Sequence, residues 1–175
     1  MDPQASISKQ LRSMSAQDDS HSQFSATGLA AAQALRQISV FLHNRTGSLR
    51  ALCALLADNH IEILGISMQD TTEMTLVRLI LSDPEAASLI FIERGIPHAE
   101  CAVVIVEVQE EASQLQHTLD SVHRAELNIE FCYHLLARPR GMPLLALHCD
   151  DTQRCAQVLA AAGQRVLSQQ ELLGN

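Results

Sequence analysis

The residues best placed to bind a ligand form a turn between a strand-like run and a helical run: Asn44, Arg45, Thr46, Gly47 and Ser48. The turn delivers the chain into a helix N-terminus, where we expect the N–H groups of Gly47, Ser48 and Leu49 to be unpaired and to point at one spot. Gly47 lets a ligand approach the backbone, and the Asn44 amide both donates and accepts hydrogen bonds. The pattern therefore favours binding of a carboxylate.

The same residue types also have a purely structural interpretation. Asn, Thr, Gly and Ser are ordinary turn residues, and many strand-to-helix loops bind nothing. Leu42 and Leu52 are expected to line the floor of any pocket here, which favours a ligand with a small or branched side chain.

The elements that position this turn have a regular order. Alternating apolar residues predict strands, helical spacing predicts the first helix, and Asp83-Pro84 before Glu85 is typical of a second helix start. The expected elements are a strand at 37–43, a helix at 48–59, strands at 61–69 and 74–81, a helix from 83 to Gly95 and a strand at 97–101. This order is the split βαβ arrangement of ferredoxin-like folds.

The same order is then repeated. The second set is a strand at 102–108, a helix at 111–125, strands at 127–136 and 143–149, a helix at 151–162 and a strand at 165–167. Landmarks align at nearly constant spacing: Leu49 with Leu115 and Ile63 with Ile129 at 66 residues, Asp83 with Asp150 at 67, and Gly95 with Gly163 at 68. An internal duplication explains this spacing.

We therefore expect an α+β fold with two ferredoxin-like βαββαβ units side by side. The sequence predicts a flexible N-terminal tail at 1–36, a first unit at 37–101 and a second unit at 102–175. The two units are expected to share an eight-stranded antiparallel sheet with four helices on one face.

The other face of that sheet carries apolar residues by alternation, namely Phe41, Ile80, Val103 and Ile105. An open apolar face of this size is usually covered by a partner, so a homodimer is expected. Charged residues on the same face, Arg78, Glu107 and Glu130, are expected to form ion pairs in the dimer interface.

At this level of detail the sequence resembles a tandem ACT-domain protein, from a family of regulatory modules that bind amino acids. The resemblance covers about residues 37 to 172 and is carried by the segments at 38–49 (ISVFLHNRTGSL), 55–63 (LLADNHIEI) and 78–85 (RLILSDPE), with second copies at 127–131 and 166–168. It implies a regulatory role in which an amino acid binds at the interface between adjacent units.

The second copy of the turn differs from the first. It contains Gln109, Glu110, Glu111, Ala112 and Ser113, with no glycine and with two acids that would repel a carboxylate. At the start of the following strand, Asn128 stands where the first unit has Glu62. The resemblance implies that this position reaches the loop of the neighbouring unit. We therefore expect one composite site, in which Asn128 and the Ile129 backbone join Asn44 and the amides of 47–49.

Composition disfavours several other classes of function. The net charge is -8, with 12 Lys and Arg against 20 Asp and Glu, and aromatic residues make up 3%, so nucleic acid is not an expected partner. No apolar run reaches the roughly 18 to 20 residues of a membrane span and no secretory signal is visible, which predicts a cytoplasmic protein. The 5 cysteines include no Cys-x-x-Cys pair, so a disulfide framework is not expected.

Catalysis, metals and cofactors are also not expected. Cys132, His134 and His148 form a conceivable metal cluster, but we expect them to line an interface instead. No nucleophile triad or phosphate loop is present. Together with the resemblance, which implies a regulatory role, these observations predict a non-catalytic regulatory protein that binds a small amino acid. The alternative is an interaction module or regulatory subunit that docks on a metabolic enzyme without a ligand of its own.

Overall fold

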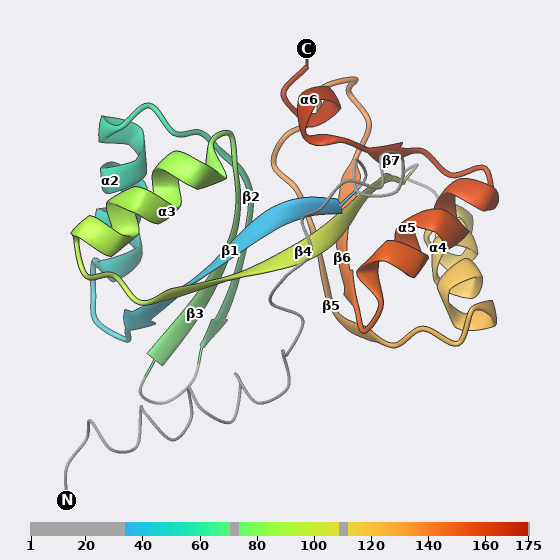
Figure 1. Cartoon of the computed structure of the whole chain (residues 1–175), viewed down its shortest axis with the longest axis horizontal. Coiled ribbons are helices and arrows are strands. Elements are labelled where there is room, and N and C mark those ends of the chain that lie inside the picture. Colours follow the sequence, from blue (N-terminus) through green and yellow to red (C-terminus); the bar gives the residue numbers. More distant parts are fainter. Residues whose placement is uncertain (1–33, 71–73, 109–111, 175) are drawn as a thin grey trace, which may run out of the picture.

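The computed structural model describes residues 34–70, 74–108 and 112–174. In chain order these ranges contain β1 (Ala34–His43), α2 (Ser48–Asp58), β2 (Ile63–Asp70), β3 (Met74–Leu81), α3 (Pro84–Glu93), β4 (His98–Glu107), α4 (Ala112–Arg124), β5 (Ile129–His134), β6 (Leu144–Cys149), α5 (Thr152–Ala161), β7 (Val166–Leu167) and α6 (Gln169–Leu172) (Figure 1). Residues 1–33 of the expected tail lie outside the described part, and residues 34–36 belong to β1.

Aspartate caps set the start of one helix in each unit. The Asp83 carboxylate accepts a hydrogen bond from Ala86 N at 2.9 Å, and the Asp151 carboxylate accepts one from Arg154 N at 2.8 Å. Both caps satisfy a backbone donor that the helix itself cannot satisfy. The equivalent of Asp83 is therefore Asp151, 68 residues on, and the expected pairing of Asp83 with Asp150 is one residue out of register.

The units share β4, which is one continuous strand. Its first part pairs antiparallel with β1, from Val40↔His98 to Ala34↔Val104, and its second part pairs with β6, from Val104↔Leu147 to Glu107↔Leu144. The sequence predicted two strands, at 97–101 and 102–108, but no turn residue separates Cys101 from Ala102. The described residues therefore form a 7-stranded sheet, in the order β2-β3-β1-β4-β6-β5 with β7 on β4, and the expected eight strands are incorrect.

This sheet curls until its two edge strands meet. Gly65 of β2 forms an isolated antiparallel bridge with Leu135, and the amides of Leu136 and Ala137 both donate to the Leu64 carbonyl at 2.9 Å. A Cβ atom on Gly65 would lie 2.9 Å from Leu135 Cγ. The absence of a side chain at Gly65 is what permits the edges to approach this closely.

The curl buries the sheet face that was expected to be open. Ile80, Val103 and Ile105 each have 0% of their surface exposed within a single chain. They form an inner core together with Leu35, Leu64, Leu135, Leu144, Ala146, Leu167 and Leu172. Only Phe41 of the predicted set is partly exposed. The apolar face that motivated a homodimer is therefore covered by the chain itself.

The three charged residues expected in a dimer interface also have contacts within the chain. The Arg78 guanidinium lies 4.2 Å from the centre of the Phe131 ring, which favours a cation–π interaction. Glu107 pairs with Arg165 at 3.4 Å, and Glu130 lies 3.5 Å from His148. A half-buried contact joins the two units, since the Tyr133 hydroxyl donates to the Gln37 side-chain carbonyl at 2.8 Å, and burial raises the pKa of Tyr133 above its ordinary value.

Among the described residues, four helices cover the outer side of the sheet (Figure 1). Ile38 and Val40 pack under α2 and α3, whereas Val104 and Val106 pack under α4 and α5. The pairs Ala34↔Val104 and Ile38↔Glu100 place Ile38 and Val104 on the same side of the sheet. The short α6 is different, because its Leu172 packs in the inner core. The expected arrangement, with all helices on one face, is therefore incomplete. No helix in the described ranges is long and apolar enough to cross a membrane.

We predict that Gly65→Ala lowers the free energy of unfolding by about 1–3 kcal/mol, because the new methyl group overlaps Leu135. Urea denaturation followed by circular dichroism measures this change. In the double variant with Leu135→Ala the overlap is removed. The double variant should therefore lose less unfolding free energy than the sum of the losses in the two single variants. Strict additivity would show that Gly65 and Leu135 do not meet.

Candidate functional site

A surface hollow of about 260 Å³ lies where β1, β2 and β3 meet the start of α2. Its lining comes from the first unit alone: Leu42, His43, Asn44, Arg45, Gly47, Ser48, Leu49, Arg50, Met68, Asp70 and Thr75. Five of the eight predicted site residues, Asn44, Arg45, Gly47, Ser48 and Leu49, therefore line one hollow. Thr46 is exposed and is not part of the lining.

The turn that lines this hollow leads into the N-terminus of α2, and the first residues of that helix belong to the lining. Gly47 is the N-cap of α2, with φ +90° and no side-chain cap, and glycine adopts this left-handed conformation without strain. The Ser48 amide donates to the Arg45 carbonyl at 3.1 Å, so the expectation that it is unpaired is wrong. Within the described residues, the amides of Leu49 and Arg50 have no acceptor. These two donors remain for an anionic group.

The hollow also contains a carboxylate that the sequence did not identify as a site residue. Asp70 accepts a hydrogen bond from Asn44 Nδ2 at 3.2 Å and one from the Thr75 hydroxyl at 2.9 Å. These bonds hold the carboxylate in place and use one of the two N–H donors of the Asn44 side chain, while its second N–H and its carbonyl oxygen remain available. The hollow therefore combines helix N-terminal donors with a fixed negative charge.

Register explains why Asp70 belongs here and how it could have been found. β1 pairs with β3 so that Leu42 lies opposite Thr75 and His43 opposite Met74. The paired ends of β2 and β3, at Asp70 and Thr75, therefore lie beside the turn that follows β1. If the pairing of β1 with β3 had been predicted from the sequence, it would have placed Asp70 next to Asn44.

Charged and apolar groups complete the lining. Arg45 and Arg50 are exposed, and neither has an ion-pair partner among the described residues. Leu42, Leu49 and Met68 supply apolar surface. Leu52, which was expected in the floor, is buried in the outer core beneath α2 and α3 and does not reach the hollow.

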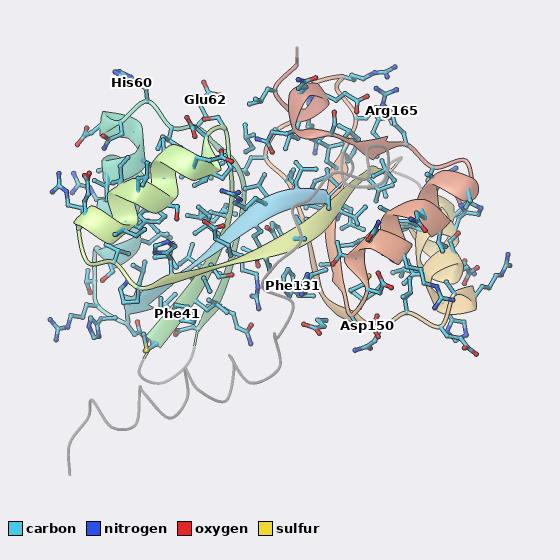
Figure 2. All side chains as sticks on the ribbon, in the orientation of Figure 1. Phe41, His60, Glu62, Phe131, Asp150 and Arg165 are labelled. Atoms are coloured by element: carbon cyan, nitrogen blue, oxygen red, sulfur yellow. The ribbon has the colours of Figure 1, made fainter. Side chains whose placement is uncertain are left out.

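Asn128 and Ile129, the second part of the predicted composite site, do not line the hollow. The Asn128 amide donates to the Asp150 carboxylate at 3.2 Å, and the Asp150 amide donates to the Asn128 carbonyl at the same distance. Ile129 packs in the second unit's outer core. Figure 2 shows Asp150 in the half of the molecule opposite Phe41, a residue of β1. A single chain therefore does not bring the two parts together.

The remaining sequence hypotheses concern the second turn and metals. Gln109, Glu110 and Glu111 lie outside the described residues, and α4 begins at Ala112. In the described ranges no three His, Cys, Asp or Glu residues are grouped so that they could hold a metal ion. Cys132 and His134 are exposed on β5, whereas His148 Nδ1 lies 2.7 Å from the Ala102 carbonyl and its ring stacks on Phe131.

Comparisons with known proteins agree with this architecture. A family model described as an ACT domain pair matches residues 33–174. The structure of protein BT0572 from Bacteroides thetaiotaomicron is 21% identical and has a TM-score of 0.74, over 81% of this chain and 96% of that one. The ligand-free regulatory subunit of aspartate kinase from Thermus thermophilus is 12% identical with a TM-score of 0.54, over 74% of this chain and 93% of that one. No curated protein matches the sequence.

We predict that Gly47→Ala destabilises the turn, because an L-residue at φ +90° is strained even where space is open. The expected loss of unfolding free energy is about 1–2 kcal/mol, measured by urea denaturation. Thr46→Ala is the matched control in the same turn and should change stability by less than about 0.5 kcal/mol. Equal stabilities for both variants would contradict the left-handed cap.

Proposed function

The chain belongs to the family of ACT domain pairs, and from this premise we propose that it is a regulatory protein that binds a free amino acid in the hollow beside Asn44. The binding groups are the amides of Leu49 and Arg50, the carboxylate of Asp70 and the side chain of Asn44. The rest of the chain positions these groups, and the proposal assigns it no catalytic step.

The observation that carries this proposal is the pairing of opposite charges across one small hollow. The α2 N-terminus favours an anion and the fixed Asp70 carboxylate favours a cation. A free α-amino acid carries a carboxylate and an ammonium group on the same carbon atom. It therefore suits both partners, whereas a simple carboxylic acid would meet the unfavourable charge of Asp70.

The size of the hollow supports a metabolite of this class. Its volume of about 260 Å³ lies just below the roughly 300–1,000 Å³ of pockets that hold drug-sized ligands. Leu42, Leu49 and Met68 offer apolar contacts for a modest side chain. A few net hydrogen bonds of about 1 kcal/mol each predict affinity in the micromolar range.

The regulatory part of the proposal rests on the family and on the relatives it resembles. One solved structure of similar fold is that of the regulatory subunit of aspartate kinase from Thermus thermophilus. We propose that the module regulates an enzyme by docking on it in a ligand-dependent way. The same proposal includes a cytoplasmic location, where free amino acids are available. Because one chain supplies the lining of the hollow, the site as proposed does not need a homodimer.

A second candidate function is docking on an enzyme without a ligand. The observation that favours it is a pair of exposed apolar residues on α3, Leu89 at 63% and Ile92 at 65%. They lie one helical turn apart and form an apolar surface that a partner protein would cover.

We predict that a thermal-shift screen of the standard amino acids identifies one or a few that stabilise the protein. A ligand at 100 times its Kd adds about 2.7 kcal/mol to the free energy of unfolding. The corresponding 2-oxo acid, which lacks the ammonium group, should give no shift. If no amino acid shifts the melting temperature, the amino-acid proposal is wrong and the docking module becomes the better account.

Calorimetry with three variants then locates the site. Asp70→Asn removes the negative charge while keeping the shape, so we predict at least about tenfold weaker binding, equivalent to 1.4 kcal/mol. Asn44→Ala should also weaken binding, whereas Asn128→Ala should bind like the unmodified protein. Loss of affinity in Asn128→Ala would instead indicate a composite site completed by a second copy of the chain.

A further inference from the structure

Two buried thiols lie against each other in the second unit, away from the hollow. Cys149 is the last residue of β6 and Cys155 lies in the first part of α5. Their sulfur atoms are 3.2 Å apart, and the residues are 2% and 0% exposed. Both belong to the outer core beneath α4 and α5, which contains Val104 and Leu159 as well. In Figure 2, Asp150 marks the turn that connects the two elements.

Packing alone does not require sulfur at these positions. The helix caps Asp83 and Asp151 relate the two units by 68 residues, so the counterparts of Cys149 and Cys155 are Leu81 and Ala87. Both counterparts are buried in the first unit's outer core. The same fold is therefore built with Leu and Ala in one unit and with two thiols in the other.

Contact between the thiols changes their acidity. The Cys149 thiol donates a hydrogen bond to the Cys155 sulfur, and this bond lowers the pKa of Cys155. The same bond, together with burial, raises the pKa of Cys149. Burial and the carboxylates of Asp150 and Asp151 act against the Cys155 thiolate. The hydrogen bond is the largest of these effects, and its direction favours Cys155 as the thiolate of the pair and Cys149 as its proton donor.

We propose that Cys149 and Cys155 form a site of oxidative modification, at which hydrogen peroxide closes an intramolecular disulfide between the end of β6 and α5. Peroxide is the two-electron oxidant, and the two sulfur atoms are the reductants.

The reaction has two balanced steps. The Cys155 thiolate attacks one oxygen of hydrogen peroxide, so a sulfur–oxygen bond forms and the oxygen–oxygen bond breaks. The leaving hydroxide takes up a proton and becomes water, which leaves Cys155 as a sulfenic acid. The Cys149 sulfur then attacks the Cys155 sulfur, so the disulfide bond forms and the sulfur–oxygen bond breaks. The Cys149 proton leaves with the hydroxyl group as a second water molecule.

The geometry needs only a small adjustment for this bond. The sulfur atoms must approach from 3.2 Å to roughly 2.05 Å, a movement of about 1 Å. Cys155 lies near the start of α5, where Asp151, Gln153 and Arg154 are exposed, and local opening of this turn is the route by which the proposal requires a small oxidant to enter. Hydrogen peroxide is close to water in size, whereas a protein disulfide is too large to enter.

The positions of the arginines make the product directly detectable. Trypsin cleaves after Arg140, Arg154 and Arg165, so Cys149 and Cys155 fall in two different peptides, 141–154 and 155–165. The experiment treats the reduced, folded full-length chain with hydrogen peroxide, blocks the remaining thiols with an alkylating agent under denaturing conditions, and analyses the tryptic peptides by mass spectrometry. We expect the two peptides to be joined by a disulfide, with a mass about 2 Da below their sum.

Two variants serve as matched controls. Cys155→Ala copies the residue that the first unit uses at this position and should abolish the cross-link while the circular dichroism spectrum is kept. Cys132→Ala removes an exposed thiol of β5 and should leave the cross-link unchanged. The proposal is overturned if, after peroxide treatment, the chain without substitutions gives peptides 141–154 and 155–165 as separate species, each with its cysteine alkylated. It is also overturned if the cross-link forms only in denaturant, or if Cys155 pairs instead with Cys132.

Discussion

Burial of the inner core is the interaction on which the rest of this structure depends. A flat pair of ferredoxin-like units would leave one apolar sheet face in water, and Ile80, Val103 and Ile105 lie on that face. The sheet instead curls until Gly65 meets Leu135, and the two units bury this face against each other. β4 passes through both halves, since it pairs first with β1 and then with β6. Neither unit therefore has a complete sheet of its own.

The shared frame supports different chemistry in its two halves. In the first unit, pairing of β1 with β3 brings Asp70 beside the glycine-capped start of α2, which leaves an open hollow of mixed charge. In the second unit, Cys149 at the end of β6 and Cys155 in α5 form a pair of thiols. The first unit has Leu81 and Ala87 at the equivalent positions. A duplicated fold keeps its packing in both copies, whereas residues that packing does not require are free to diverge.

Local patterns in the sequence predicted the order of elements and the turn at Asn44, because alternation, aspartate caps and glycine turns act over short distances. They did not reveal the closure, since alternation identifies an apolar face without saying what covers it. Gly65 within a strand was the available signal, because glycine there often marks a close approach of another backbone.

Asp70 was missed for a similar reason, since it reaches the site only through strand pairing. The pairing of the Ser48 amide within its own turn depends on the exact backbone path.

Native-state hydrogen exchange tests most directly whether the two units form one cooperative structure around the inner core. The amides of Val77 and Leu79 in β3 report on the first unit, and those of Leu145 and Leu147 in β6 report on the second. If the inner core joins the units, all four amides should exchange through the same global opening, with equal free energies. Exchange of one unit at a free energy lower by more than about 1 kcal/mol would show that the units open separately and would contradict this account.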